Sequence, residues 1–245
     1  MHTDRLNIST LCSLAVIAFV AACAAHEAAG HGIACLSTGG TVTLLTSVYF
    51  RCRPSIPFVD AAGPLMNLAV AATSAIALHR NRQPSRRTVF FGLLLAFSGF
   101  WGAGYFIFSA MTNVGDLAFV LRDLSLEPRW LWRLGMGILG MWLYVKILRK
   151  ASGFVPKGMP LFVAYCVVGV VGCASVLFYQ GPTLPALKDA AQESLLAPSG
   201  LLFIAFGRPS TQPILVPASR TVIMAAAVTI AIFWFTLGKG ISVPH

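Results

Sequence analysis

The first apolar stretch of this chain contains ionisable side chains where hydropathy predicts lipid. The stretch from Leu11 to about Leu36 is long enough to cross a membrane, yet it includes Ala25-His26-Glu27-Ala28-Ala29-Gly30-His31-Gly32. Ionisable groups at that depth are costly, and proteins that keep them there generally use them for ions, protons or metal. The cluster therefore constrains the fold, because the rest of the chain has to bury it and supply its partners.

The composition excludes an ordinary soluble domain. Hydrophobic residues make up 57% of the 245 positions and charged residues only 11%, and the mean hydropathy is +0.77. Repeated apolar runs of about 20 residues predict an all-α polytopic protein, integral to the lipid bilayer and multi-pass. The net charge of +10 does not indicate a nucleic-acid partner, because the basic residues cluster between apolar runs, as the positive-inside rule requires.

We predict one membrane domain over residues 1–245, with about six transmembrane helices. These cover about 11–36, 61–78, 89–111, 130–148, 159–179 and 221–237. Pro64 falls in the first turn of the second span, where its missing N–H costs nothing. Thr41–Arg53 has the composition of strands and predicts a short re-entrant β-like segment. Leu117–Arg129 resembles an interfacial helix, and Gly181–Ser219 is a long connection whose apolar part is too short to cross.

Two further patterns concern the cysteines. Val20-Ala21-Ala22-Cys23, after Arg5 and an apolar run, resembles the cleavage site of a lipoprotein signal peptide, but five further spans favour a membrane helix. The six cysteines show no CxxC spacing, and five lie in or next to apolar runs. We expect most of them to be small buried residues and not disulfide partners or metal ligands.

An even number of spans places both termini on one face, called face A, and the opposite face is called face B. By this path face A has ten basic residues, namely Arg5, Arg80, Arg82, Arg86, Arg87, Lys146, Arg149, Lys150, Lys157 and Lys239. Face B has eight, namely Arg51, Arg53, Arg122, Arg129, Arg133, Lys188, Arg208 and Arg220. The totals are close, but the charges of face A lie in short loops, where they orient a protein most strongly.

Three motifs converge on the half of the membrane next to face B. The first span has its two histidines in that half, and the second span starts in it with Gly63-Pro64-Leu65-Met66-Asn67. Asp116 follows the end of the third span on the same side. Two imidazoles and a carboxylate suit Zn²⁺ with one position left for water, whose proton Glu27 could accept. The alternative is that both histidines are hydrogen-bonded packing residues.

These residues resemble the site-2 proteases, which are intramembrane zinc metalloproteases. His26-Glu27-Ala28-Ala29-Gly30-His31 is similar to the HExxH motif of that family, Gly63–Asn67 matches its GPxxN helix start, and Asn113-Val114-Gly115-Asp116 resembles its Asp-bearing motif. The resemblance covers residues 10–120, the metalloprotease-like core, and leaves 121–245 as additional transmembrane helices. It implies His26, His31 and Asp116 as zinc ligands, Glu27 as general base, and Asn67 as a partner of the substrate backbone or oxyanion.

By the same resemblance, Thr41–Arg53 corresponds to a membrane-associated β element to which an unwound substrate could add as a strand. The sites of the family are usually reached from the cytoplasmic half, whereas the charge count places face B outside. Which side the site faces is therefore left open.

The spacing of the histidines departs from the family motif. On an ideal α-helix, residues five apart point about 140° apart, whereas residues four apart point about 40° apart. Both imidazoles reach one metal only if the helix widens into a π-bulge or unwinds at Gly30. Otherwise Glu27 and His31 could be the ligands, or the site is degenerate and inactive.

The sequence therefore predicts an intramembrane zinc metalloprotease that hydrolyses a peptide bond in a membrane-embedded protein. The runner-up is a non-enzymatic membrane protein that binds metal or carries protons or ions, and the third is an inactive protease-like scaffold. An ion carrier should offer polar residues in other spans or an inverted repeat, and the last three spans offer almost none. The substrate and the oligomeric state do not follow from the sequence.

Overall fold

The computed structural model describes residues 6–81, 83–208, 214 and 216–242, and these are mostly helical. Arg5, Arg82 and the terminal histidines lie outside them. Six helices of the described chain are long and apolar enough to cross a membrane. They are α1 (Ile8–Ala24) continued by η1 (Ala25–Gly32) and α2 (Ile33–Ser37), α3 (Pro57–Arg80), α4 (Arg86–Thr112), α6 (Arg129–Ala151), α7 (Met159–Ser175) with η2 (Val176–Phe178), and α10 (Arg220–Phe233) with η5 (Trp234–Gly238).

The start of α3 and the length of α5 differ from the sequence predictions. The helix α3 begins at Pro57, so Pro64 lies inside it and not in its first turn. Pro57 occupies the first helical position, where proline is favoured, whereas Pro64 leaves one carbonyl without its usual intrahelical donor. A short helix is present where an interfacial helix was predicted, namely α5 (Asp116–Asp123), and it ends earlier than the sequence suggested.

The strand-like segment forms a hairpin, as predicted. Strand β1 (Thr41–Leu45) pairs antiparallel with β2 (Phe50–Arg53), with an irregularity between Val42 and Leu44. A third strand, β3 (Ile241–Ser242), comes from the carboxyl-terminal region and pairs with the other edge of β1. The order β2-β1-β3 leaves β2 as an edge strand of this sheet.

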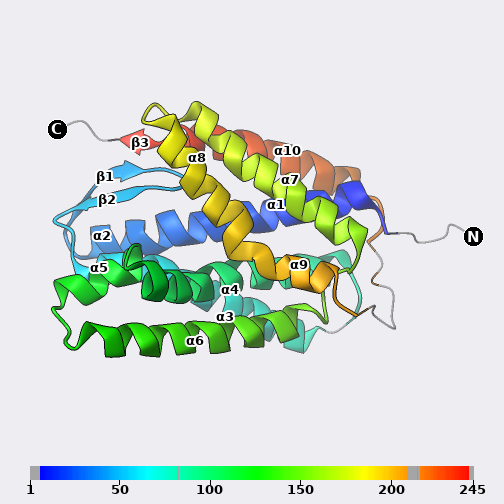
Figure 1. The fold of residues 1–245 in the computed structure, drawn as a ribbon. Helices are drawn as coiled ribbons and strands as arrows, with labels where there is room; N and C mark the ends of the chain where they lie inside the picture. Colours follow the sequence, from blue (N-terminus) through cyan, green and yellow to red (C-terminus); the bar gives the residue numbers. More distant parts are fainter. Residues whose placement is uncertain (1–5, 82, 209–213, 215, 243–245) are drawn as a thin grey trace, which may run out of the picture.

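The centre of the bundle is α1, which contacts α4, α7 and α10 (Figure 1). Aromatic side chains fill the space between these helices. The Phe19 ring lies 5.9 Å from the rings of both Phe97 and Trp101, and 6.2 Å from Phe233. This packing fixes the position of α1, and with it that of η1 at its carboxyl end.

The connection between α7 and α10 also runs from one end of the bundle to the other. We call residues Thr183–Ala205 the return arm; it consists of α8 (Thr183–Ala191), η3 (Gln192–Leu196), η4 (Ala197–Ser199) and α9 (Gly200–Ala205). At the hairpin end, Tyr49 donates a hydrogen bond to Asp189 over 2.7 Å. At the other end, the Gly158 N–H donates to the Ala205 carbonyl over 2.9 Å.

The path of the return arm corrects the predicted topology. After it, the chain starts α10 at face A, where the Ser219 N–H donates to Thr10 Oγ1 over 3.0 Å. Helix α10 then ends at face B, where the Ser47 N–H donates to the Leu237 carbonyl over 2.8 Å. The described ends of the chain therefore lie at opposite ends of the bundle (Figure 1), and the prediction that both termini share face A was wrong.

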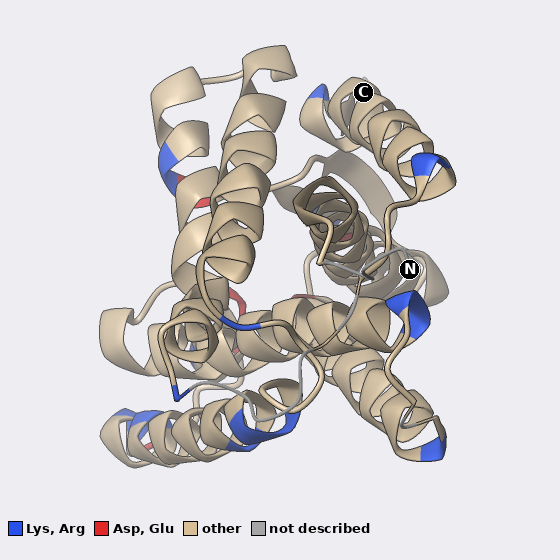
Figure 2. Ribbon diagram, turned by 90° about the vertical axis from the view of Figure 1, so that its right-hand side faces the viewer, with Lys and Arg blue, Asp and Glu red and all other residues tan. Residues whose placement is uncertain are grey.

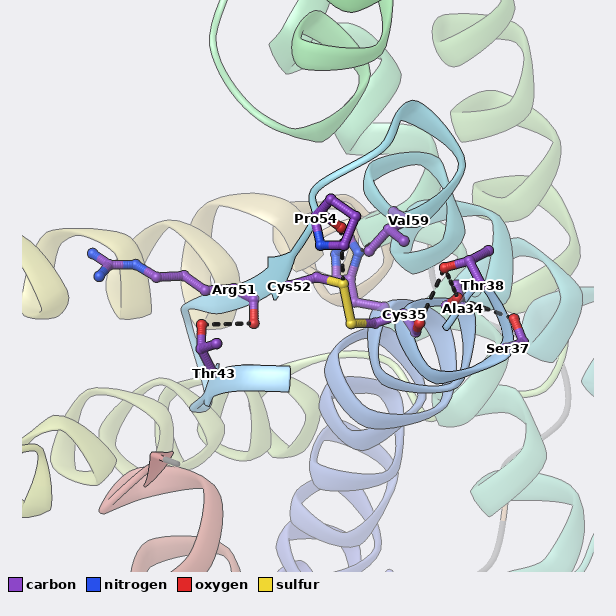
Figure 3. The surroundings of a disulfide bond; sticks show 10 residues. Ala34, Cys35, Ser37, Thr38, Thr43, Arg51, Cys52, Pro54 and Val59 are labelled. Atoms are coloured by element: carbon purple, nitrogen blue, oxygen red, sulfur yellow. Dashed lines mark hydrogen bonds between the residues drawn. A yellow bond between two sulfur atoms is a disulfide. The ribbon is translucent and has the colours of Figure 1, made fainter. Parts of the chain in front are cut away.

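The prediction about the cysteines was wrong for two of the six. Cys35 in α2 and Cys52 in β2 form a disulfide (Figure 3), whereas Cys12, Cys23, Cys166 and Cys173 are unpaired. The hairpin folds back onto the end of the first helix, which brings together two cysteines that the linear pattern keeps 17 residues apart.

Candidate metal centre

The segment that holds both histidines is a π-helix. Backbone hydrogen bonds between residues five apart extend over Ala25–Gly32, between the ordinary α-helices α1 and α2. Because a π-helix bonds each residue to the one five positions away, residues five apart lie on the same side. Of the alternatives that the sequence left open, the structure has the widened helix, and His26 and His31 face one another.

The two imidazoles and Asp116 meet at one point. His26 Nε2 lies 3.2 Å from His31 Nε2, and Asp116 Oδ2 lies 3.3 Å from the former and 3.4 Å from the latter. Ligand atoms about 2.0–2.1 Å from a tetrahedral Zn²⁺ are about 3.3–3.4 Å from one another. The three donor atoms therefore have the spacing of three corners of a zinc tetrahedron. This trio could hold a metal ion.

The remaining nitrogen of each imidazole has its own partner. His31 Nδ1 lies 2.7 Å from the Val59 carbonyl, which only accepts, so Nδ1 carries a hydrogen, and in the neutral imidazole Nε2 then has the lone pair. His26 Nδ1 lies 3.2 Å from the Asn67 side-chain amide, which is fully buried. Such contacts orient metal-binding histidines and fix their tautomers.

The amide of Asn67 can present either its oxygen or its nitrogen to His26. With Nε2 bound to a metal, Nδ1 of His26 carries a hydrogen and needs an acceptor. The Oδ1 atom of Asn67 is buried without a hydrogen-bond partner. Exchanging the positions of Oδ1 and Nδ2 by rotation of the Asn67 amide places Oδ1 next to the hydrogen on His26 Nδ1. This contact supports a positioning role for Asn67, and its contact with a substrate stays a prediction.

The cluster has more acceptors than donors. Asp116 Oδ2 and Glu27 Oε2 are buried without a well-directed hydrogen bond. Burial raises the pKa of Asp116, but its contacts with His26 and His31 outweigh burial and hold that pKa at about 2, so the carboxylate is ionised. A buried carboxylate needs a cation beside it, either a protonated imidazole or a bound metal ion. The donor set therefore fits a metal ion and favours His26 over Glu27 as the partner of His31.

Glycine allows α3 to approach the cluster. A Cβ atom at Gly63 would collide with His31 Nε2 and would lie 2.8 Å from His26 Nε2. A Cβ atom at Gly30 would lie 2.7 Å from the Gly63 Cα atom. The first glycine of the Gly63–Asn67 motif thus leaves room for the histidines and for whatever they bind.

Aromatic rings enclose the imidazoles. Trp101 and Tyr105 from α4 stack on His26 with ring centroids 5.4 and 5.0 Å away. Phe50 from β2 stacks on His31 at 5.2 Å. His26, Glu27 and His31 are buried, whereas the Asp116 side chain is 19% exposed. Asp116 is therefore the member of the cluster that is partly exposed, at face B.

The structure brings His26, His31, Asp116 and Asn67 together, and Glu27 is buried in the same π-helix as the two histidines. Sequence reasoning missed the Val59 carbonyl and the three aromatic rings, because backbone acceptors and ring faces leave no spacing signal. It also missed Glu193 in η3, which is buried and on which the charge of Glu27 acts. Glu193 was placed in a connection and not in a span, so its burial could not be inferred.

Comparisons with protein-family models, with curated proteins and with solved structures found no match. The functional argument therefore depends on the geometry of this cluster and on the chemistry of its residues.

Proposed function

We propose that the protein is an intramembrane zinc metalloprotease of the site-2 type, acting on membrane-embedded protein substrates. The observation that carries the proposal is the equal spacing of His26 Nε2, His31 Nε2 and Asp116 Oδ2, at 3.2 to 3.4 Å. Three protein ligands with a free fourth position are typical of catalytic zinc, whereas structural sites usually have four.

Each residue of the cluster has a chemical task in this proposal. His26, His31 and Asp116 hold Zn²⁺, which supplies Lewis acidity when bound. Glu27 accepts a proton from water as the water oxygen adds to the peptide carbonyl carbon, and returns that proton to the departing amine nitrogen. Asn67 and the Val59 carbonyl hold the two imidazoles in orientation.

The hairpin supports the handling of a membrane-embedded substrate. A helical peptide bond is protected by its own hydrogen bonds and has to be extended before water can attack it. Strand β2 pairs with β1 on one side, and its Phe50 lies on His31. An extended substrate that adds to the other side of β2 would have its backbone hydrogen bonds satisfied next to the metal ligands.

The experiment compares the purified wild-type chain with Glu27→Gln and Asp116→Asn. We expect about one zinc per chain in the wild type and in Glu27→Gln, and much less in Asp116→Asn. Cleavage of single-span membrane peptides, followed by mass spectrometry, should be lost in Glu27→Gln by about 100-fold or more. Glu127→Gln, a change at an exposed surface carboxylate, is the matched control and should leave cleavage unchanged. A wild-type protein without zinc would overturn the proposal.

A non-enzymatic metal, proton or ion carrier is the second candidate. The observation that favours it is the presence of two buried glutamates, Glu27 in η1 and Glu193 in η3. A carrier should retain full zinc binding, show no cleavage of any peptide, and move protons or metal across proteoliposomes. If the carrier is right, Glu193→Gln should slow transport in the proteoliposomes. If the protease is right, Glu193→Gln should leave peptide cleavage intact.

A further inference from the structure

The two ends of the bundle differ in their basic residues once the path of the return arm is known. Lys157 Nζ donates to the Arg208 carbonyl over 2.8 Å, and Arg220 begins α10 beside Thr10. Both arginines therefore lie at face A, whereas Lys239, after η5, lies beside the sheet at face B. The sequence had placed all three on the opposite face.

The corrected placement gives face A a small excess of basic residues, because the path predicted from the sequence put eight of the sixteen described Lys and Arg on each face. Nine described basic residues lie at face A, namely Arg80, Arg86, Arg87, Lys146, Arg149, Lys150, Lys157, Arg208 and Arg220. Seven lie at face B, namely Arg51, Arg53, Arg122, Arg129, Arg133, Lys188 and Lys239. Figure 2 looks onto face A and shows basic segments at the ends of several helices. By the positive-inside rule, face A is cytoplasmic.

The disulfide gives an independent indication about face B. Cys35 lies about one turn beyond His31, and Cys52 lies in the hairpin, so the bond joins the metal-bearing helix to the sheet (Figure 3). Val59, whose carbonyl orients His31, packs in the same small cluster. Disulfides persist in oxidising compartments and are rare where cytosolic reductants keep thiols reduced.

From these two features we infer that face B, and the metal centre with it, lies on the oxidising, non-cytoplasmic side of the membrane. The inference rests on the proposed membrane protease and specifies its substrates: membrane proteins cut in the half of the bilayer away from the cytoplasm. Asp116, whose side chain is partly exposed, is the predicted ligand nearest to the solvent on that side.

Two cysteine variants test the orientation in the full chain. Glu127→Cys places a thiol in the exposed loop between α5 and α6 at face B, and Arg86→Cys places one at the exposed start of α4 at face A. In spheroplasts of a bacterial host, a membrane-impermeant maleimide should label Glu127→Cys before lysis and Arg86→Cys only after lysis. The wild-type chain gives the background from the four free cysteines. Labelling of Arg86→Cys alone, or of both before lysis, would overturn the inference.

The disulfide is tested on the same preparations with a membrane-permeant maleimide. Cys35 and Cys52 should react only after reduction, and Cys52 should react without reductant in a Cys35→Ser variant. Reaction of both in the unreduced wild type would remove one of the two supports and contradict an oxidising face B. Neither assay requires zinc or activity, so a wrong orientation is distinguishable from a wrong function, and Glu27→Gln should give the same labelling as the wild type.

Discussion

At the scale of single residues, the candidate metal centre is determined by a few atoms around two imidazoles. The Val59 carbonyl and the Asn67 amide occupy the nitrogens that face away from Asp116, and Gly63 leaves space on the α3 side. The histidines, Asp116 and the motif of Gly63 could be named from the sequence because they are chemically unusual in apolar helices. Their partners could not, because a carbonyl at position 59 depends only on where α3 passes.

Replacing Gly63 with alanine should remove the metal while the fold persists. Its new methyl group would occupy the space beside both Nε2 atoms. We expect zinc content to fall at least about tenfold, a loss of the size seen when metal-site surroundings are altered, measured by elemental analysis of the monodisperse protein. Gly104→Ala on α4 is the matched control, since a Cβ atom there meets nothing within 4 Å. Normal zinc content in Gly63→Ala would contradict the placement of the metal.

Substitutions of Asn67 test its role as the acceptor for His26. Asn67→Leu removes the acceptor and should weaken zinc binding about 10–100-fold, as measured by competition with a chelating dye. Asn67→Asp keeps an oxygen in place and should restore affinity close to the wild type. If both variants bind zinc equally weakly, the amide acts through packing alone and the proposed hydrogen bond is absent.

At the scale of the elements, the π-helix is the decisive feature. The sequence predicted that His26 and His31 could bind one metal only if the helix between them were distorted, because residues five apart point in different directions on a regular α-helix. It did not distinguish widening from unwinding at Gly30, and the structure shows widening over Ala25–Gly32. The hairpin was likewise predictable from its β-branched residues, whereas its third strand comes from residues 241–242, almost two hundred positions away.

Deleting Ala29 should convert the π-helix into an α-helix without loss of zinc. The histidines would then be four apart, a spacing that an α-helix brings to one face. Zinc analysis should give about one ion per chain. Insertion of an alanine between Ala28 and Ala29 is the matched control and should abolish binding, since neither type of helix aligns residues six apart. Loss of zinc after the deletion would show that the widened turn itself is required.

At the scale of the whole molecule, the return arm determines where the chain ends. Hydropathy located the six long helices but not the arm, whose helices are short and interrupted by Lys188, Asp189, Gln192 and Glu193. Of these four residues only Glu193 is buried, and the arm packs against α7, where a Cβ atom at Gly172 would lie 2.5 Å from Ser194. Tyr165 also donates to the Leu195 carbonyl over 2.8 Å. Burial against protein is a tertiary property, which a window along the sequence does not measure.

Reporters at the two termini should lie on opposite sides of the membrane. A fluorescent reporter that matures only in the cytoplasm should be active at the amino terminus and inactive at the carboxyl terminus of the full chain. The control is a chain that ends after residue 181, before the return arm. A reporter at its new carboxyl terminus should also be inactive, because α7 ends at face B. Active reporters at both termini of the full chain would contradict the described path.

The widened turn of η1 also has a consequence for how a site with histidines five residues apart can arise. A residue gained inside an α-helix ordinarily turns every later side chain to a new direction, but a π-helix absorbs the extra residue locally. The residues between the two histidines in this turn include the small Ala28, Ala29 and Gly30. A lineage could therefore gain one residue between two metal ligands and keep both the site and the helix beyond it. Searches that demand a fixed interval between histidines would miss such chains.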